Sequence, residues 1–389
     1  AFRIRGTNLG NWLVPEGYMF DFGICESPRF IDEMFRQLVG PEETVKFWNA
    51  FKDNYITEAD IAFIAATGSN TVRLPFHYKL FTVEDYLGSN DPEEGFRRVD
   101  DVIGWCRRHG MKVILDMHAC PGGQSGTNHD DSYGYPWLFR SEALQRQYCG
   151  IWRKIAARYA NEPVVLGYDI MNEPIPWYHS DKEELNAVMA KVQRRAADAI
   201  REVDTRHVII FAGTQANSNF KPFENFKFGV NEMLSCHYYA FNKPEYDDGA
   251  VARFAAAGQK AGVPMYMGET GHNTYGWYRE ITRSMEEKGI GRPSTYTQSV
   301  STLFTRKYVD KDGKSIVPTE LGKVVNKLLV ESFTNVVSEE FTAEMEDKFD
   351  NIALGKQEWK KVIEEFYGPF KVDLDKAIQH YTILLETLR

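Results

Sequence analysis

The sequence predicts an α/β fold, a (β/α)8 TIM-type barrel whose eighth unit is atypical or incomplete, followed by a mainly helical C-terminal segment. Short apolar runs alternate with helical patterns up to about residue 280, which is typical of a parallel sheet with helices between its strands. Several of these runs end in polar or charged residues, and in a parallel barrel such strand ends meet at one rim. After about residue 290 the apolar runs give way to helical patterns, which indicates a second domain.

Seven apolar runs of strand length follow one another in the first part of the chain. They predict strands at residues 4–9, 71–74, 112–117, 165–170, 207–212, 233–237 and 264–268. The patterns between them predict helices at residues 58–67, 95–109, 141–159, 182–203 and 249–261. Because a (β/α)8 barrel needs eight strands, closure requires one more strand after these seven.

The eighth unit should begin near Gly289, and there the sequence departs from the pattern. Pro293 lacks the backbone donor that a sheet requires, and Ser294 is typical of a helix N-terminus. We therefore expect a barrel domain over residues 1–291 and a different, helical segment over residues 292–389.

The helical segment contains one expected hairpin. Residues 308–317 have the pattern of two short strands, with the turn at Asp312 and Gly313. From Glu320 onward the apolar residues recur at helical spacing, including a stretch over residues 341–349. The sequence contains no internal repeat. It also contains no low-complexity linker between the two parts.

Composition limits the possible classes of function. At 389 residues, with 43% hydrophobic and 14% aromatic residues, the chain is long and apolar enough for a full core. A net charge of -9 and a pI near 5.6 argue against a protein whose main task is to coat nucleic acid or an anionic membrane. No run approaches 18 consecutive apolar residues, so no membrane span is expected. The compartment stays open between secreted and cytoplasmic, and the sequence predicts no oligomeric state.

Two glutamates are the main candidates for catalysis. Glu173 and Glu269 each follow a short apolar run that is predicted to be a buried strand. Two carboxylates at one rim of a barrel can cleave a glycosidic bond. Asn172 can donate to a sugar hydroxyl beside Glu173, and Arg73 is the best candidate for a cation that keeps a nucleophilic carboxylate ionised.

The alternative is that both glutamates are ordinary surface carboxylates at strand ends. Further polar residues on other strand ends favour the catalytic interpretation, namely His118, His237 and Tyr239. Aromatic residues in or near the rim loops could stack on sugar rings or could equally belong to the core. These aromatic residues are Trp12, Tyr135, Trp137, Trp177 and Trp277.

The loop at residues 120–131 raises the question of a metal or phosphate site. It contains Gly122, Gly123, His129 and Asp130, but it has neither metal-ligand spacing nor the Gly-Lys-Ser/Thr ending of a phosphate loop. We therefore expect no metal and no cofactor.

Residues 1 to about 291 resemble glycoside hydrolase family five, a family of retaining (β/α)8 barrels. The resemblance is carried by motifs at residues 5–14, 70–75, 115–118, 171–174, 237–239 and 267–271. It implies that Glu173 is the acid/base and Glu269 the nucleophile. It also implies that the residues around the cleaved sugar are Arg73, His118, Asn172, His237 and Tyr239. The opening motif is most similar to the exo-β-1,3-glucanase and endo-β-1,4-glucanase branches, which implies a β-linked glucan oligosaccharide or polysaccharide as substrate.

Residues from about 285 onward resemble a different family, the bacterial type IA DNA topoisomerases. The matching motifs are at residues 286–296, 317–322, 340–346 and 366–370. The resemblance implies that Arg292 and Thr295 correspond to positions that contact a DNA backbone. The catalytic tyrosine motif and the acidic metal-binding cluster of that family are missing from this sequence, so no topoisomerase activity is expected. Acidic residues outnumber basic ones from residue 280 onward, and nucleic acid is not an expected partner.

Two functional hypotheses follow from the sequence. The first is a retaining β-glucan hydrolase that acts by double displacement, with its two carboxyl groups about 5 to 5.5 Å apart. The second is a chimeric, catalytically impaired protein that only binds carbohydrate or, weakly, single-stranded nucleic acid. The atypical eighth unit favours the second hypothesis because a missing strand can misplace Glu269.

Overall fold

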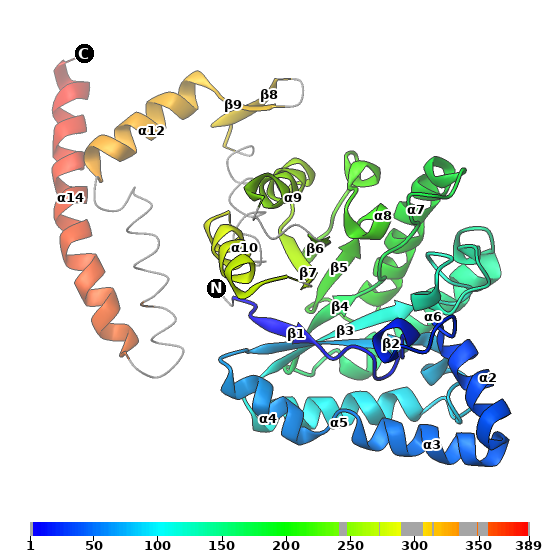
Figure 1. Ribbon diagram of the computed structural model, residues 1–389. Coiled ribbons are helices and arrows are strands. Elements are labelled where there is room, and N and C mark those ends of the chain that lie inside the picture. The colour runs from blue at the N-terminus through cyan, green and yellow to red at the C-terminus, as the bar shows by residue number, and fades with distance from the viewer. Residues whose placement is uncertain are drawn as a thin grey trace. The chain divides into compact units, whose positions relative to one another are not determined.

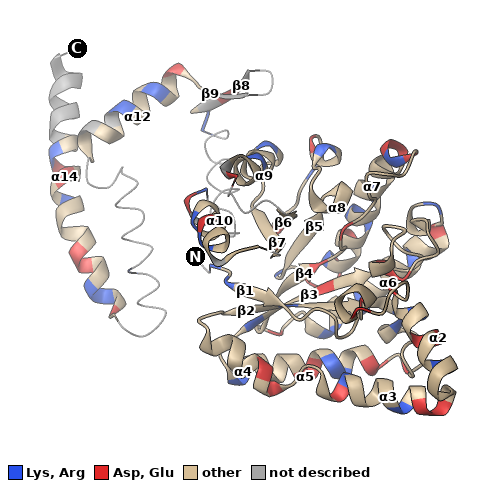
Figure 2. Cartoon of the chain, viewed as in Figure 1, with Lys and Arg blue, Asp and Glu red and all other residues tan. Residues whose placement is uncertain are grey.

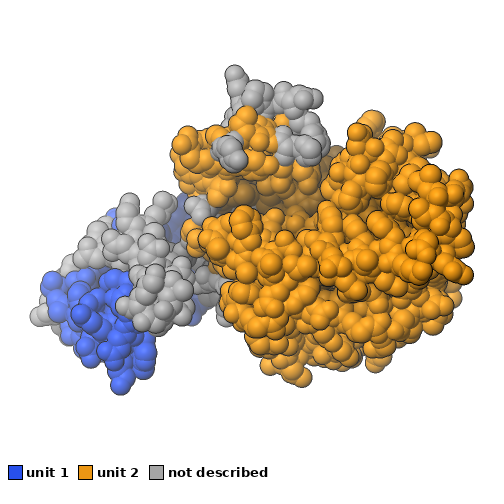
Figure 3. Space-filling view, turned by 60° about the horizontal axis from the view of Figure 1, so that its bottom comes forward, with its two compact units in different colours: residues 1, 294–389 blue, residues 2–293 orange. Residues whose placement is uncertain are grey.

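The computed structural model describes residues 3–240, 247–271, 273–288, 306–312, 315–333, 348 and 357–387. The chain divides into two compact units, one of residues 2–293 and one that consists of residue 1 and residues 294–389 (Figure 3).

The first unit is built on a parallel sheet of seven strands in chain order, which curves into a nearly closed barrel (Figure 1). Each strand pairs in parallel with the next, for example with Asn8 opposite Arg73 and His237 opposite Glu269. The predicted strands are confirmed, with shifts of up to three residues at their ends. They are β1 (Gly6–Asn8), β2 (Thr71–His77), β3 (Lys112–Ala119), β4 (Val165–Asp169), β5 (Val208–Ala212), β6 (Glu232–Tyr239) and β7 (Met265–Gly271).

Helices cover the outside of the barrel. The five predicted helices are confirmed to within two residues as α4 (Glu58–Ala66), α5 (Glu94–Arg108), α6 (Glu142–Tyr159), α7 (Lys182–Arg201) and α9 (Asp248–Ala261). Five more helices complete the described α-helices of this unit: α1 (Gly17–Phe20), α2 (Pro28–Val39), α3 (Pro41–Asn54), α8 (Thr214–Asn217) and α10 (Tyr275–Glu287). Short 3-10 turns occupy the loops: η1 (Tyr78–Phe81), η2 (Asn128–Asp130), η3 (Trp137–Phe139) and η4 (Lys221–Phe223).

The sequence gives local reasons for the helices that the pattern analysis did not identify. Ser27 accepts a hydrogen bond from the backbone of Phe30 and caps α2, whose first residue is Pro28. Pro41 likewise stands at the first position of α3, after Gly40 with a φ of 84°. Both are helix-start signals of the expected kind.

Burial of the strands on both faces explains why their sequences are continuous apolar runs. Every residue of β2 and all but the first residue of β3 are buried, because parallel strands face the barrel interior on one side and helices on the other. The largest buried side chains include Trp12, Trp48 and Trp152. Charged residues of both signs occur along the outer helices α3, α4 and α5 (Figure 2), and Arg108 of α5 forms an ion pair with Glu58 of α4.

The seam between β1 and β7 differs from the rest of the barrel. Within the described residues, β1 has only β2 as a strand neighbour and β7 has only β6. A cavity of about 490 Å³ lies at this seam, lined by residues of β1, β7 and α10. The Asn8 side chain bridges the seam through a hydrogen bond from Nδ2 to the backbone oxygen of Gly268, at 3.2 Å. Residues 289–294, where the eighth unit was expected to begin, lie outside the described residues.

The second unit contains a hairpin and two long helices in its described part. β8 (Val309–Asp312) pairs antiparallel with β9 (Ser315–Pro318), which confirms the hairpin, while the predicted turn at Gly313 lies outside the described residues. The helices are α12 (Glu320–Ser332) and α14 (Trp359–Thr387), and the rings of Phe333 and Phe370 stack at 5.6 Å. The helix expected over residues 341–349 lies almost wholly outside the described residues. Of the helices described in either unit, none has the length and apolarity needed to cross a membrane.

Candidate active site

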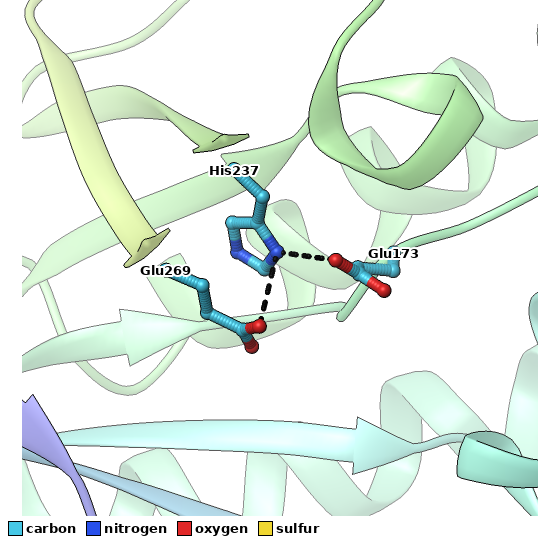
Figure 4. A group of neighbouring side chains, drawn as sticks. All are labelled: Glu173, His237 and Glu269. Atoms are coloured by element: carbon cyan, nitrogen blue, oxygen red, sulfur yellow. Dashed lines mark hydrogen bonds and ion pairs between the residues drawn. The ribbon is translucent and has the colours of Figure 1, made fainter. Parts of the chain in front are cut away.

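The two glutamates predicted from the sequence approach each other at the carboxyl end of the barrel. Glu173 follows β4, and Glu269 lies within β7. His237 on β6 stands between them (Figure 4). Its Nδ1 is 2.8 Å from Glu173 Oε1 and 3.5 Å from Glu269 Oε2. One carboxylate oxygen of each glutamate lies within 4.8 Å of the other.

Arg73 forms ion pairs with Glu269 and with two further carboxylates of the barrel interior, Asp116 and Asp169. Its guanidinium lies 2.7 Å from Glu269 Oε1, 2.8 Å from Asp169 Oδ2 and 3.1 Å from Asp116 Oδ1. The same group donates to Asn172 Oδ1 at 2.9 Å and to Asn8 Oδ1 at 3.3 Å. Arg73 is only 2% exposed, so its charge depends on these partners for compensation.

This environment keeps Glu269 ionised. Burial alone would raise the pKa of its carboxyl group, but His237, Arg73 and His118, together with the hydrogen bond from Tyr239, outweigh burial and hold the pKa well below its usual range. The Tyr239 hydroxyl donates to Glu269 Oε2 at 2.8 Å. A carboxylate that stays charged inside a barrel is suited to act as a nucleophile.

The pKa of Glu173 results from a different balance of effects. Burial raises the pKa of its carboxyl group, the hydrogen bond with His237 lowers it, and the negative charge of Glu269 raises it again, with a net lowering. Its ionisation is therefore tied to the charge of Glu269. A carboxyl group whose pKa follows the charge of its neighbour can act as an acid in one step of a reaction and as a base in the next.

His118 and Asn172 complete the same network. His118 Nδ1 is 2.7 Å from Asp116 Oδ2, and its Nε2 is 3.2 Å from Asn172 Nδ2. Burial disfavours the charged form of His118, but Asp116 and Glu16 outweigh it and raise the pKa of the imidazole to about 9. The structure therefore brings together all seven polar residues that the sequence predicted for this rim: Arg73, His118, Asn172, Glu173, His237, Tyr239 and Glu269.

The aromatic candidates separate into two groups. Trp137 in η3 is 47% exposed and Trp177 is 74% exposed, so both can offer a ring face to a ligand. Trp277 is 1% exposed in α10 and packs against Tyr238, with ring centroids 6.0 Å apart. Its assignment as a substrate-binding residue is corrected here, because a core side chain has no free face for a sugar. Trp12 is a core residue as well.

Sequence reasoning did not identify Glu16 or the two buried aspartates. Glu16 is 8% exposed, its Oε1 lies 3.9 Å from His118 Nε2, and burial raises its pKa. Asp116 and Asp169 are fully buried and lie opposite each other on β3 and β4. A charged residue inside an otherwise apolar strand was the available signal for both aspartates.

The described residues contain one group of at least three side chains whose geometry could hold a metal ion, and it consists of Glu173, His237 and Glu269. In the loop at residues 120–131, Asp130 Oδ2 instead accepts hydrogen bonds from the backbone of Ser125 at 2.5 Å and Gly126 at 3.1 Å. Arg292 and Thr295, the candidates for nucleic-acid contact, lie outside the described residues.

Fold and rim together define the class of barrel hydrolases that carry paired carboxylates. Residues 36–303 match the family model described as cellulase (glycosyl hydrolase family 5), and this match covers more than half of the chain. The chain belongs to that family.

Curated relatives match each part of the chain. The β-xylosidase of Phanerodontia chrysosporium is 32% identical over 222 residues, which is 57% of this chain and 44% of that protein. Endoglucanase C of Acetivibrio thermocellus (strain ATCC 27405) is 31% identical over 166 residues, covering 43% of this chain and 45% of that protein. DNA topoisomerase 1 of Xylella fastidiosa (strain 9a5c) is 46% identical over 91 residues, 23% of this chain and 11% of that protein. The chain thus spans less than half the length of each of these relatives.

Solved structures support the barrel fold. The rutinosidase from Aspergillus niger superposes with a TM-score of 0.58 at 18% identity, and the match covers 77% of this chain and 88% of that one. At this identity the likeness shows the fold alone. The comparisons therefore establish a family 5 glycoside hydrolase barrel joined to a fragment that resembles a topoisomerase.

Proposed function

We propose that this chain hydrolyses β-linked glucans with retention of anomeric configuration, with Glu269 as nucleophile and Glu173 as acid/base. The observation that carries the proposal is the approach of the two glutamates, whose oxygens come within 4.8 Å of each other. Retaining enzymes hold their carboxyl groups about 5 to 5.5 Å apart, whereas inverting enzymes leave about 6.5 to 9.5 Å for a water molecule. The short approach supports the retaining mechanism.

The reaction has two displacements. In the first, a Glu269 oxygen attacks the anomeric carbon, the bond from that carbon to the leaving oxygen breaks, and Glu173 gives its proton to the leaving oxygen. In the second, Glu173 takes a proton from water, the water oxygen bonds to the anomeric carbon, and the bond to Glu269 breaks. Each displacement inverts the anomeric carbon, so the two displacements together retain the configuration.

The electrostatics of the two glutamates fit the change of Glu173 from acid to base. The negative charge of Glu269 raises the pKa of Glu173 in the free enzyme. When Glu269 becomes esterified to the sugar, that charge disappears and the pKa of Glu173 falls. A lower pKa favours the carboxylate form, which is the form that acts as base in the second step. Displacement of His237 from Glu173 by the substrate would remove the hydrogen bond that lowers the pKa before the first step.

The substrate class rests on the relatives and on the rim. The matched relatives are named as a β-xylosidase and an endoglucanase. The exposed rings of Trp137 and Trp177 are suited to stack on the apolar faces of β-linked sugars. Among β-linked substrates we favour glucans, because the opening motif at residues 5–14 is most similar to the glucanase branches of the family.

A second candidate is a barrel that binds carbohydrate without turning it over. The observation in its favour is the seam at β7, the strand that carries Glu269, which has a strand neighbour on one side only within the described residues. A displacement of Glu269 by about 1 Å would cost about 100-fold in rate.

Release of a chromogenic phenol from aryl β-glucosides and cellobiosides separates the two candidates. The wild-type chain should release phenol, Glu269→Ala should abolish the release, and the exposed control Glu142→Ala should not change it. NMR of the first product should show the β-anomer. Binding without turnover would support the second candidate, and a first product in the α-configuration would exclude double displacement.

A further inference from the structure

The acid/base candidate Glu173 lies in a segment of unusual backbone conformation. Glu173 has a φ of 42° and Ile175 a φ of 53°, both in the left-handed region that residues with a side chain rarely adopt. Such conformations persist when surrounding contacts hold the backbone, and they concentrate at functional sites. The question is which contacts hold this one.

Gln124, in the loop after β3, holds the chain on both sides of Glu173. Its side chain is fully buried, and its Nε2 donates to the backbone oxygen of Asn172 at 2.7 Å. Its backbone oxygen accepts from the amide of Ile175 at 3.0 Å. The side-chain amide is itself oriented by two contacts, from Nε2 to the His118 backbone oxygen and from the Cys120 amide to Oε1.

Gln215, in the turn after β5, holds the same segment from the other side. Its backbone amide and its side-chain Nε2 both donate to the backbone oxygen of Ile175, each at 3.1 Å. Gln215 itself has a φ of 50°. Its Oε1 accepts from Asn219 Nδ2 at 2.6 Å and from Thr214 Oγ1 at 2.9 Å, which directs Nε2 toward Ile175.

We propose that Gln124 and Gln215 are positioning residues that fix the left-handed backbone of Glu173 and thereby aim its carboxyl group at the leaving oxygen, an inference that rests on the proposed acid/base role of Glu173. Relaxation of Glu173 to a negative φ would rotate its Cα–Cβ bond. The carboxyl group would then leave its position beside His237, where a distance of 2.8 Å now joins Nδ1 and Oε1. The nucleophile Glu269 would stay in place, because Arg73 and Tyr239 hold it independently of the Glu173 segment.

A pair of aryl substrates distinguishes this role from general support of the fold. Phenyl β-glucoside needs proton donation to its basic leaving oxygen, whereas dinitrophenyl β-glucoside leaves without it. We expect Gln215→Leu and Gln124→Leu to lower kcat/KM for the phenyl substrate at least ~10-fold, and for the dinitrophenyl substrate less than ~3-fold. Added azide should raise kcat for the dinitrophenyl substrate in both variants, because azide bonds to the anomeric carbon as the Glu269 ester breaks and needs no base.

The controls separate this inference from the proposed function. Gln145→Leu removes another buried glutamine, whose Nε2 donates to the Leu138 backbone oxygen at 3.1 Å, and it should affect both substrates equally. Glu173→Ala is the reference and should show the full difference between substrates together with azide rescue.

Each outcome decides one of the two claims. If Glu173→Ala shows the difference and the two glutamine variants lose both activities equally, the positioning inference fails and the proposed function stands. If Glu173→Ala affects both substrates equally, or if the wild-type chain turns over neither, the acid/base assignment fails and the positioning inference fails with it. Gln215 is half-buried, so Gln215→Leu decides the matter if Gln124→Leu does not fold.

Discussion

The two candidate catalytic glutamates are held in place by different means. Glu173 follows β4, which has strand neighbours on both sides, and hydrogen bonds between its segment's backbone and Gln124 and Gln215 hold that segment. Glu269 lies in β7, which has a strand neighbour on one side only within the described residues, and its side chain is held by Arg73 and Tyr239. The comparison shows that a carboxylate can be placed either through the backbone of its segment, as for Glu173, or through contacts of its own side chain, as for Glu269.

The largest expected effect is the loss of activity when Glu269, in β7 beside the seam, is replaced. Glu269→Gln keeps the size of the side chain and removes its charge, and we expect kcat to fall by at least ~1,000-fold, as for loss of other nucleophiles. The protein should remain folded because Arg73 keeps Asp116 and Asp169 as partners. Steady-state kinetics and circular dichroism would check both points, with Glu142→Gln as an exposed control. Retention of more than a tenth of the activity would contradict the nucleophile assignment.

The second prediction concerns the buried cation. Arg73→Met leaves Asp116 and Asp169 buried without their main counter-charge, and we expect the free energy of unfolding to fall by about 3–5 kcal/mol. Urea denaturation measures this change. The matched control is Arg153→Met, which removes an exposed pair with Glu202 and should cost less than about 1 kcal/mol. Equal effects of the two substitutions would show that Arg73 does not stabilise the fold by neutralising the buried aspartates.

The third prediction is a pH dependence that arises from His118. The folded state raises the pKa of His118 from the ordinary 6.5 to about 9, so the folded state binds a proton more tightly than the unfolded state. The resulting stabilisation is fully present below pH 6.5 and is lost as the pH rises toward 9, with a slope of at most about 1.4 kcal/mol per pH unit. Urea denaturation from pH 6 to 9.5 should show this loss, and His118→Asn should reduce it. An unchanged profile in His118→Asn would assign the loss to other groups.

The smallest expected effect concerns the bridge across the seam. Asn8→Ala removes the hydrogen bond to the Gly268 backbone oxygen and one contact to Arg73, and we expect a loss of about 1 kcal/mol in the free energy of unfolding. Because Gly268 precedes Glu269, kcat should fall while the loss of stability stays small. Asn54→Ala, on the outer surface of α3, is the control. If Asn8→Ala matches this control in both measurements, the bridge does not help to place Glu269.

The sequence predicted those features that depend on local patterns of residue types. Alternating apolar runs and helical patterns predicted the seven strands and five of the helices, and polar residues at strand ends predicted the seven side chains of the rim network. Glu16 and the buried aspartates were missed because each has a partner distant in sequence, as where Arg73 meets Asp169 across 96 positions. Trp277 was misassigned because an aromatic residue after a rim strand has the same pattern whether its ring faces a ligand or the core.

What the sequence determined by itself is the parallel barrel, the order of its elements and the change of family near residue 290, because hydrophobic periodicity and motifs are local properties of the chain. Tertiary structure alone decided how the glutamates are held. The approach of Glu173 and Glu269, the cluster of carboxylates around Arg73 and the left-handed segment between Gln124 and Gln215 all depend on contacts between different strands and loops. Such contacts form only when the barrel brings those strand ends to one rim, where burial makes each unpaired charge costly and so selects the pairs that are seen.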